Sequence, residues 1–155
     1  MWLIARRIRL CDQAFVGRTA RINFIIAPTG LVGRIVTPTA HASKVQLLID
    51  RNAAAGALVE RTRAQGIVIG SGADTLRMEF VPVTADVKVG DTIVTSGVDG
   101  IYPKGFVIGK VEQVDAGNGI YKVIRLRPSV EFNRLEEVLV VTTPPAQDAQ
   151  VEGRS

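Results

Sequence analysis

The sequence predicts an all-β protein made of two small β-barrel-like subdomains, with a short helix at its start. Three observations lead to this fold class. From residue 21 onward, short runs rich in Val, Ile and Thr alternate with Gly, Pro, Asp and Asn, which is the pattern of strands and turns. These runs follow one another too closely to leave room for the long helices that parallel sheets need. The run Asp115-Ala116-Gly117-Asn118-Gly119 separates two long apolar stretches and is typical of a hairpin loop.

Ten strands are expected along the chain. In the stretch 75–81, Leu76, Met78 and Phe80 alternate with polar residues, so one face is expected to be buried and the other exposed to water. The other runs are shorter or more uniformly apolar. The predicted strands are residues 22–27, 31–37, 44–49, 56–62, 66–70, 75–81, 92–96, 106–115, 119–127 and 138–143.

Two stretches of the chain resemble each other. Each has a Pro-x-Gly turn, an apolar step, a second Gly followed by a basic residue, and then a strand. They are Pro28-Thr29-Gly30-Leu31-Val32-Gly33-Arg34-Ile35 and Pro103-Lys104-Gly105-Phe106-Val107-Ile108-Gly109-Lys110-Val111. A repeat of one small β unit explains the similarity, and chance in a sequence rich in Gly and Val is the alternative. In either case we interpret five glycines as structural residues, at turns, at bulges or where two backbones come close. They are Gly30, Gly33, Gly97, Gly105 and Gly109.

The net charge of +4 comes from the start of the chain. Residues 1–28 hold five arginines against one aspartate, and the 14 basic and 14 acidic residues that follow cancel. Ile4, Ile8, Cys11 and Phe15 recur at helical spacing in this segment. We therefore expect a short amphipathic helix that packs on the body, with a helix on a membrane surface as the alternative.

The pattern divides the chain into three parts. Residues 1–24 form an atypical basic segment, residues 25–142 form the core of two subdomains with an uncertain and possibly interleaved boundary, and residues 143–155 are expected to be a disordered tail.

Composition excludes several kinds of protein. The chain has 155 residues, 46% of them hydrophobic and 22% charged, which is typical of a soluble globular protein. Its single Cys leaves no partner for a disulfide, and one Cys with one His falls short of a structural zinc site. No apolar run reaches the length of about 18 to 20 residues that spans a membrane. We expect no cofactor and no metal.

One catalytic arrangement deserves a test. His41 and Ser96, with an aspartate between them in the sequence, have the chain order of a two-barrel serine protease. The candidate aspartates are Asp50, Asp74, Asp86 and Asp91. Because Ser96 lacks a glycine-rich surround for an oxyanion hole and His41 lies in a polar stretch, we expect no enzyme. An RNA-binding β-barrel module is a second alternative, but the balanced charge of the body gives it little support, so no nucleic-acid partner is expected.

The order of motifs resembles the core of the MreC family of rod shape-determining proteins, over roughly residues 25–141. The most specific match is a pair of consecutive runs. They are Gly90-Asp91-Thr92-Ile93-Val94-Thr95-Ser96-Gly97 and Tyr102-Pro103-Lys104-Gly105-Phe106-Val107-Ile108-Gly109-Lys110-Val111. The chain departs from the family in residues 1–24, which match neither the transmembrane helix nor the coiled-coil helix that the family places before this core. It also departs at Asp50-Arg51, where the family tends to have Asp-Pro.

The resemblance implies a non-enzymatic scaffold of the cell-elongation machinery, on the periplasmic face of the inner membrane. It implies self-association into dimers or filaments, and partnership with MreB, MreD, RodA and a class B penicillin-binding protein. Membrane attachment would need a segment that this sequence lacks, so the chain as given is expected to be soluble.

Three apolar residues flank the Pro-Gly turn of the second motif. Ile101, Tyr102 and Phe106 are predicted to contact protein partners, since apolar side chains at a Pro-Gly turn are costly to leave in water. The alternative is that they close one end of a barrel as part of the core.

Overall fold

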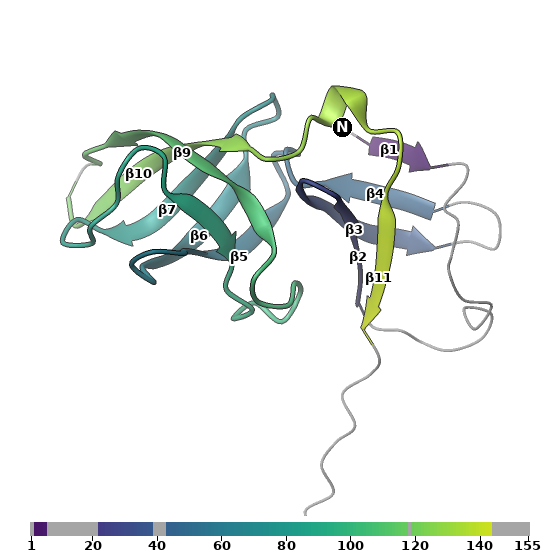
Figure 1. Ribbon diagram of the computed structural model, residues 1–155, viewed down its shortest axis with the longest axis horizontal. Helices are drawn as coiled ribbons and strands as arrows, with labels where there is room; N and C mark the ends of the chain where they lie inside the picture. The colour runs from purple at the N-terminus through teal and green to yellow at the C-terminus, as the bar shows by residue number, and fades with distance from the viewer. Residues whose placement is uncertain (1, 6–21, 39–42, 118, 144–155) are drawn as a thin grey trace, which may run out of the picture.

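The computed structural model describes residues 2–5, 22–38, 43–117 and 119–143, and these residues form two antiparallel β units (Figure 1). All ten predicted strands are present, within a few residues of their predicted ends, and an eleventh precedes them. They are β1 (Trp2–Ala5), β2 (Ile22–Ala27), β3 (Gly30–Pro38), β4 (Ser43–Leu47), β5 (Ala54–Val59), β6 (Gln65–Gly70), β7 (Leu76–Pro82), β8 (Thr92–Thr95), β9 (Val107–Asp115), β10 (Tyr121–Pro128) and β11 (Leu139–Thr143).

One unit is a closed barrel and the other is an open sheet. The barrel has the strand order β10-β7-β6-β5-β8-β9 and closes on itself through the pairing of β9 with β10. The open sheet has the order β1-β4-β3-β2-β11. Because β11 follows the barrel in the chain but pairs with β2, the barrel is inserted into the open sheet, and a 3₁₀ turn at Phe132–Arg134 lies on the connection back to it (Figure 1).

The predicted N-terminal helix is wrong at its first turn. Ile4 lies in β1, which pairs antiparallel with β4 and aligns Ile4 with Lys44. The helical spacing of apolar residues is overridden here by main-chain hydrogen bonding to the edge of a sheet. The remaining members of the predicted stripe, Ile8, Cys11 and Phe15, lie outside the described residues, as does the predicted tail from residue 144 onward.

The two similar stretches adopt the same geometry. Opposite β2, strand β3 has an extra residue, Val32, because Ile26 aligns with Leu31 and Ile25 with Gly33. Opposite β8, strand β9 has an extra residue, Ile108, because Val94 aligns with Val107 and Ile93 with Gly109. In each case the carbonyl of the bulged residue accepts a hydrogen bond from the chain just after the next strand, Leu48 N to Val32 O at 2.9 Å and Ser129 N to Ile108 O at 3.0 Å. The meanders β2-β3-β4 and β8-β9-β10 are therefore structural counterparts.

A continuous apolar core joins the two units. Phe24 of β2 is fully buried and meets two rings from the loop between β8 and β9. Its ring centroid lies 6.2 Å from that of Tyr102 and 5.0 Å from that of Phe106, in edge-on arrangements. Aromatic pairs of this geometry add specificity to the burial of apolar area. The loop from Ser96 to Phe106 thus connects two strands of the barrel, and its aromatic side chains pack at the junction of the two units.

Candidate interaction surface

The three residues predicted to contact partners occupy different environments. Tyr102 is only 2% exposed and Phe106 is half-buried, and both pack on Phe24. Ile101 is half-buried and lines a groove on the outside of the barrel. The described contacts therefore give Tyr102 and Phe106 a packing role at the junction of the units. The part that the loop plays in contacting a partner stays a prediction.

The predicted turn glycines lie where the chain bends or where backbones come close. Gly97 and Gly105, with φ of 77° and 102°, are at the two ends of the loop that holds Tyr102. Gly30 opens β3, and a side chain there would meet the carbonyl oxygen of Val107 at 2.7 Å. Gly33 and Gly109 lie inside β3 and β9, directly against the backbone of the next strand.

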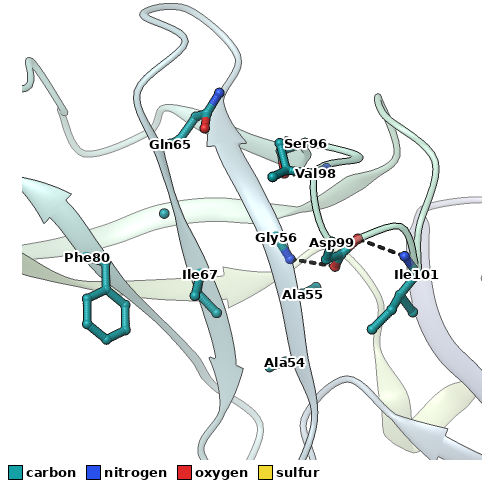
Figure 2. Close-up of a pocket in the computed structure, with 11 residues that line it drawn as sticks. Ala54, Ala55, Gly56, Gln65, Ile67, Phe80, Ser96, Val98, Asp99 and Ile101 are labelled. Carbon is teal, nitrogen blue, oxygen red and sulfur yellow. Dashed lines mark hydrogen bonds between the residues drawn. The ribbon is translucent and has the colours of Figure 1, made fainter.

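The groove crosses the outer face of β5 and β6 and has a volume of about 450 Å³. Its floor is made of small residues, Ala54 and Gly56 among them. Ile67 and Phe80 lie on one side of the floor, and Val98 and Ile101 on the other (Figure 2). The apolar lining is typical of a site that takes apolar side chains.

Asp99 fixes one wall of the groove. Its Oδ2 accepts a hydrogen bond of 2.8 Å from Gly56 N, and its Oδ1 accepts one of 3.0 Å from Ile101 N (Figure 2). Oδ1 also accepts a bond of 3.3 Å from Tyr102 N. Main-chain amides thus occupy both carboxylate oxygens, so the side chain is held in the wall rather than left free to bind an occupant of the groove. Sequence reasoning missed this residue. The signal available was an aspartate two residues before Ile101, a spacing at which the side chain often hydrogen-bonds the backbone.

The described candidates for a catalytic site make hydrogen bonds or ion pairs within the fold. Ser96 Oγ accepts a hydrogen bond from Val98 N at 3.3 Å, and His41 lies outside the described residues. Asp50 Oδ1 accepts from Asn52 N at 2.8 Å, and Asp74 Oδ2 accepts from Asn133 Nδ2 at 3.3 Å.

Asp86 and Asp91 both bind the guanidinium of Arg61. Its Nη1 lies 2.8 Å from Asp86 Oδ2 and its Nη2 lies 2.9 Å from Asp91 Oδ2. The hydrogen bonds from Arg61 lower the pKa of each carboxyl below its ordinary value. The cluster ties the turn after β5 to the loop before β8, so these carboxylates act as stabilising partners.

Within the described ranges, no three His, Cys, Asp or Glu side chains come together as metal ligands would. Among the described residues, no helix has the length and apolar character needed to cross a membrane.

Burial of Tyr102 predicts a dependence of stability on alkaline pH. Burial raises the pKa of Tyr102 to about 12, against a smaller lowering by Arg34, and Asp99 adds to the increase. A tyrosine in the unfolded chain ionises near pH ~10. The contribution of Tyr102 is therefore complete below about pH 10 and is lost as pH rises from about 10 towards 12, because the unfolded state releases the proton first.

We expect the free energy of unfolding to fall by about 2 kcal/mol between pH 9 and pH 11.5 through this group. Tyr102→Phe should remove that part of the pH dependence, as measured by urea unfolding at the two pH values. Tyr121→Phe, the same change at an exposed tyrosine, is the control for the loss of one phenol. Identical pH dependence in Tyr102→Phe and the unsubstituted protein would contradict the assignment.

Comparison with known proteins places this geometry in a family. Residues 20–142 match the family described as rod shape-determining protein MreC, barrel core. The cell shape-determining protein MreC of Escherichia coli strain K12 is 34% identical over 119 residues, covering 76% of this chain and 32% of that protein. The chain thus spans about a third of the length of this curated relative.

Solved structures agree with the sequence match. The crystal structure of MreC from Pseudomonas aeruginosa is 30% identical, with a TM-score of 0.73, over 77% of this chain and 78% of that one. A complex between the penicillin-binding protein PBP2 and MreC from Helicobacter pylori has the same fold at 19% identity, with a TM-score of 0.68, over 90% of this chain and 93% of that one. The MreC family is one of shape-determining structural proteins rather than enzymes. This chain, with its bulged repeat and inserted barrel, belongs to the MreC family of rod shape-determining proteins.

Proposed function

We propose that this chain is the periplasmic β core of a non-enzymatic scaffold that maintains rod shape in the cell-elongation machinery. The observation that carries the proposal is the match of residues 20–142 to the barrel core of MreC. The chemistry of the surface supports it, because the groove over β5 and β6 is apolar and its acidic residue is already hydrogen-bonded. A site of this kind suits binding of protein side chains better than turnover of a polar substrate.

The proposed partners are cell-wall synthesis proteins and further copies of the chain. A class B penicillin-binding protein is the partner best supported, because a relative with this fold has been solved in complex with PBP2. Family membership also suggests MreB, MreD and RodA, and self-association as a dimer or filament. The loop with Ile101, Tyr102 and Phe106 contributes to these contacts, with Ile101 at the groove and the two aromatic residues holding the loop in place.

The test is direct binding to a purified class B penicillin-binding protein from the same organism. We expect the immobilised chain to retain the periplasmic part of that protein, and we expect retention to persist between 50 and 200 mM salt. Apolar docking is little affected over this range, whereas binding driven by the arginines near the start of the chain would weaken steeply. A heat-unfolded sample of the same chain is the control. Failure to bind at tens of micromolar, or retention by the unfolded sample alone, would contradict the proposal.

A further inference from the structure

Exposed apolar side chains gather on one side of the barrel. Among the described residues, nine large hydrophobic side chains are exposed; three of them line the groove, and a fourth, Tyr121, packs on the Phe80 ring. The Phe80 and Tyr121 rings contact each other, with centroids 5.8 Å apart. We call this surface the Phe80 face, and it comprises Ile67, Phe80, Val98 and Tyr121. A patch of this kind on a soluble domain marks an interaction site.

Phe80 is held outside the barrel by its backbone. It has a φ of 62°, in the left-handed region that is costly for a bulky residue. The register explains why: Val81 aligns with Lys122 and Met78 with Ile124, so β7 has one residue more than β10 over this span. The bulge turns Phe80 away from the core and leaves its side chain 53% exposed. The ring that Phe80 meets in the described contacts is that of Tyr121, which is itself exposed, so the pair lies at the surface.

The groove next to Phe80 is a receptor for side chains. Strand β5 pairs with β6 along the groove, and the backbone N and O of Gly56 on its other side are already bonded to Asp99 Oδ2 and Ser96 N, which leaves little free edge for an added strand. An occupant must instead insert apolar groups over the floor of Ala54 and Gly56, between Ile67 and Ile101 (Figure 2). Phe80 lies at the rim, so a protruding aromatic group and a groove for apolar groups are adjacent on one surface.

We propose that the Phe80 face is a two-fold interface in which Phe80 of each copy enters the groove of the other. A symmetric dimer needs one surface that is complementary to itself, and this face has both the protruding group and the recess. Its charges agree: Arg77 and Glu79 form an ion pair of 2.6 Å next to Phe80, so the two charges beside the ring compensate each other within one copy. Two copies that meet at Phe80 therefore do not bring uncompensated Arg77 or Glu79 charges together. The inference rests on the self-association proposed above and names the surface that performs it.

The experiment is sedimentation velocity of the whole chain over a range of concentrations, with three variants. Phe80→Asn removes the ring and keeps a residue that tolerates positive φ, so the fold should persist, as its thermal midpoint will report. Ala54→Trp fills the groove and leaves Phe80 in place. Val89→Ser, at a 68% exposed apolar residue outside the groove lining, is the matched control.

We expect the unsubstituted chain and Val89→Ser to shift from monomer to dimer with concentration. Phe80→Asn and Ala54→Trp should each weaken dimerisation at least tenfold. Mixing these two variants should restore a weaker dimer, because Phe80 of the Ala54→Trp chain can enter the open groove of the Phe80→Asn chain. A monomer at every concentration, or Phe80→Asn dimerising like the unsubstituted chain, would overturn the proposal.

Binding of the penicillin-binding protein separates this inference from the proposed function. If Phe80→Asn loses that binding while its sedimentation is unchanged, the Phe80 face serves the other protein and the two-fold interface is wrong. If the unsubstituted chain dimerises through Phe80 but binds no penicillin-binding protein, the interface stands and the proposed scaffold role fails.

Discussion

Phe24→Ala is expected to lower the free energy of unfolding by about 3–5 kcal/mol, the range for truncating a buried aromatic residue. Phe24 has no exposed surface, and its ring meets those of Tyr102 and Phe106 where the open sheet joins the barrel. The substitution leaves a cavity between the two units that neither can fill without moving the loop after β8. Urea unfolding followed by circular dichroism measures the change.

The matched control is Phe80→Ala, which removes the same atoms from a ring that is 53% exposed. Its cost should be smaller, because the ring has about half its area already in water and the strained backbone is no better suited to Phe than to Ala. Equal losses in the two variants would show that Phe24 is not a principal contact between the units. A second transition in Phe24→Ala alone would show that the residue couples their unfolding.

Much of the fold could be predicted because local signals and long-range packing agree. In the ten predicted strands, β-branched residues fall between turn residues, and each strand found a neighbour in a sheet. The first strand was missed because Trp2–Ala5 is short and the spacing of Ile4 with later apolar residues favours a helix. Its pairing with β4, more than 35 residues away in the chain, decides the outcome, and no local pattern reports such a pairing.

The prediction that Phe80 is buried is wrong because of a single bulge. Alternation places it on the buried face with Leu76 and Met78, and those two residues are indeed buried. The extra residue in β7 reverses the phase after Met78, so that Val81 is buried and Phe80 is exposed. Nothing in the sequence around Phe80 suggests a positive φ, since Gly or Asn would be the usual residue there.

The groove was beyond sequence reasoning for a related reason. It is built from four separate segments, represented by Gly56, Ile67, Phe80 and Ile101, which only the closed barrel brings together. The prediction for Ile101, Tyr102 and Phe106 rested on the cost of exposing apolar residues in a turn. In the structure that cost is met for Tyr102 by burial against Phe24, which lies in the other unit and nearly 80 residues earlier.

Gly109→Ala should destabilise the protein by about 3 kcal/mol or more, because the added methyl group has no room. A Cβ at Gly109 would overlap the carbonyl oxygen of Arg127 on β10, and main-chain atoms of a paired strand cannot rotate away as a side chain can. The repeat makes a second prediction from the same cause. Gly33 lies against the carbonyl oxygen of Gln46 in the counterpart meander, so Gly33→Ala should cost a similar amount.

Gly90→Ala separates the clash from the backbone preference of glycine. Gly90 has a φ of 92°, but a Cβ there meets no atom within 4 Å, so its substitution costs only the strain of the positive φ, about 1–2 kcal/mol. Thermal and urea unfolding should therefore rank Gly109→Ala and Gly33→Ala together, well below Gly90→Ala in stability. If Gly33→Ala is tolerated while Gly109→Ala is not, the two bulged meanders differ in how closely their strands approach. In that case the repeat is one of topology only, without the shared close packing that we derive from its second glycine.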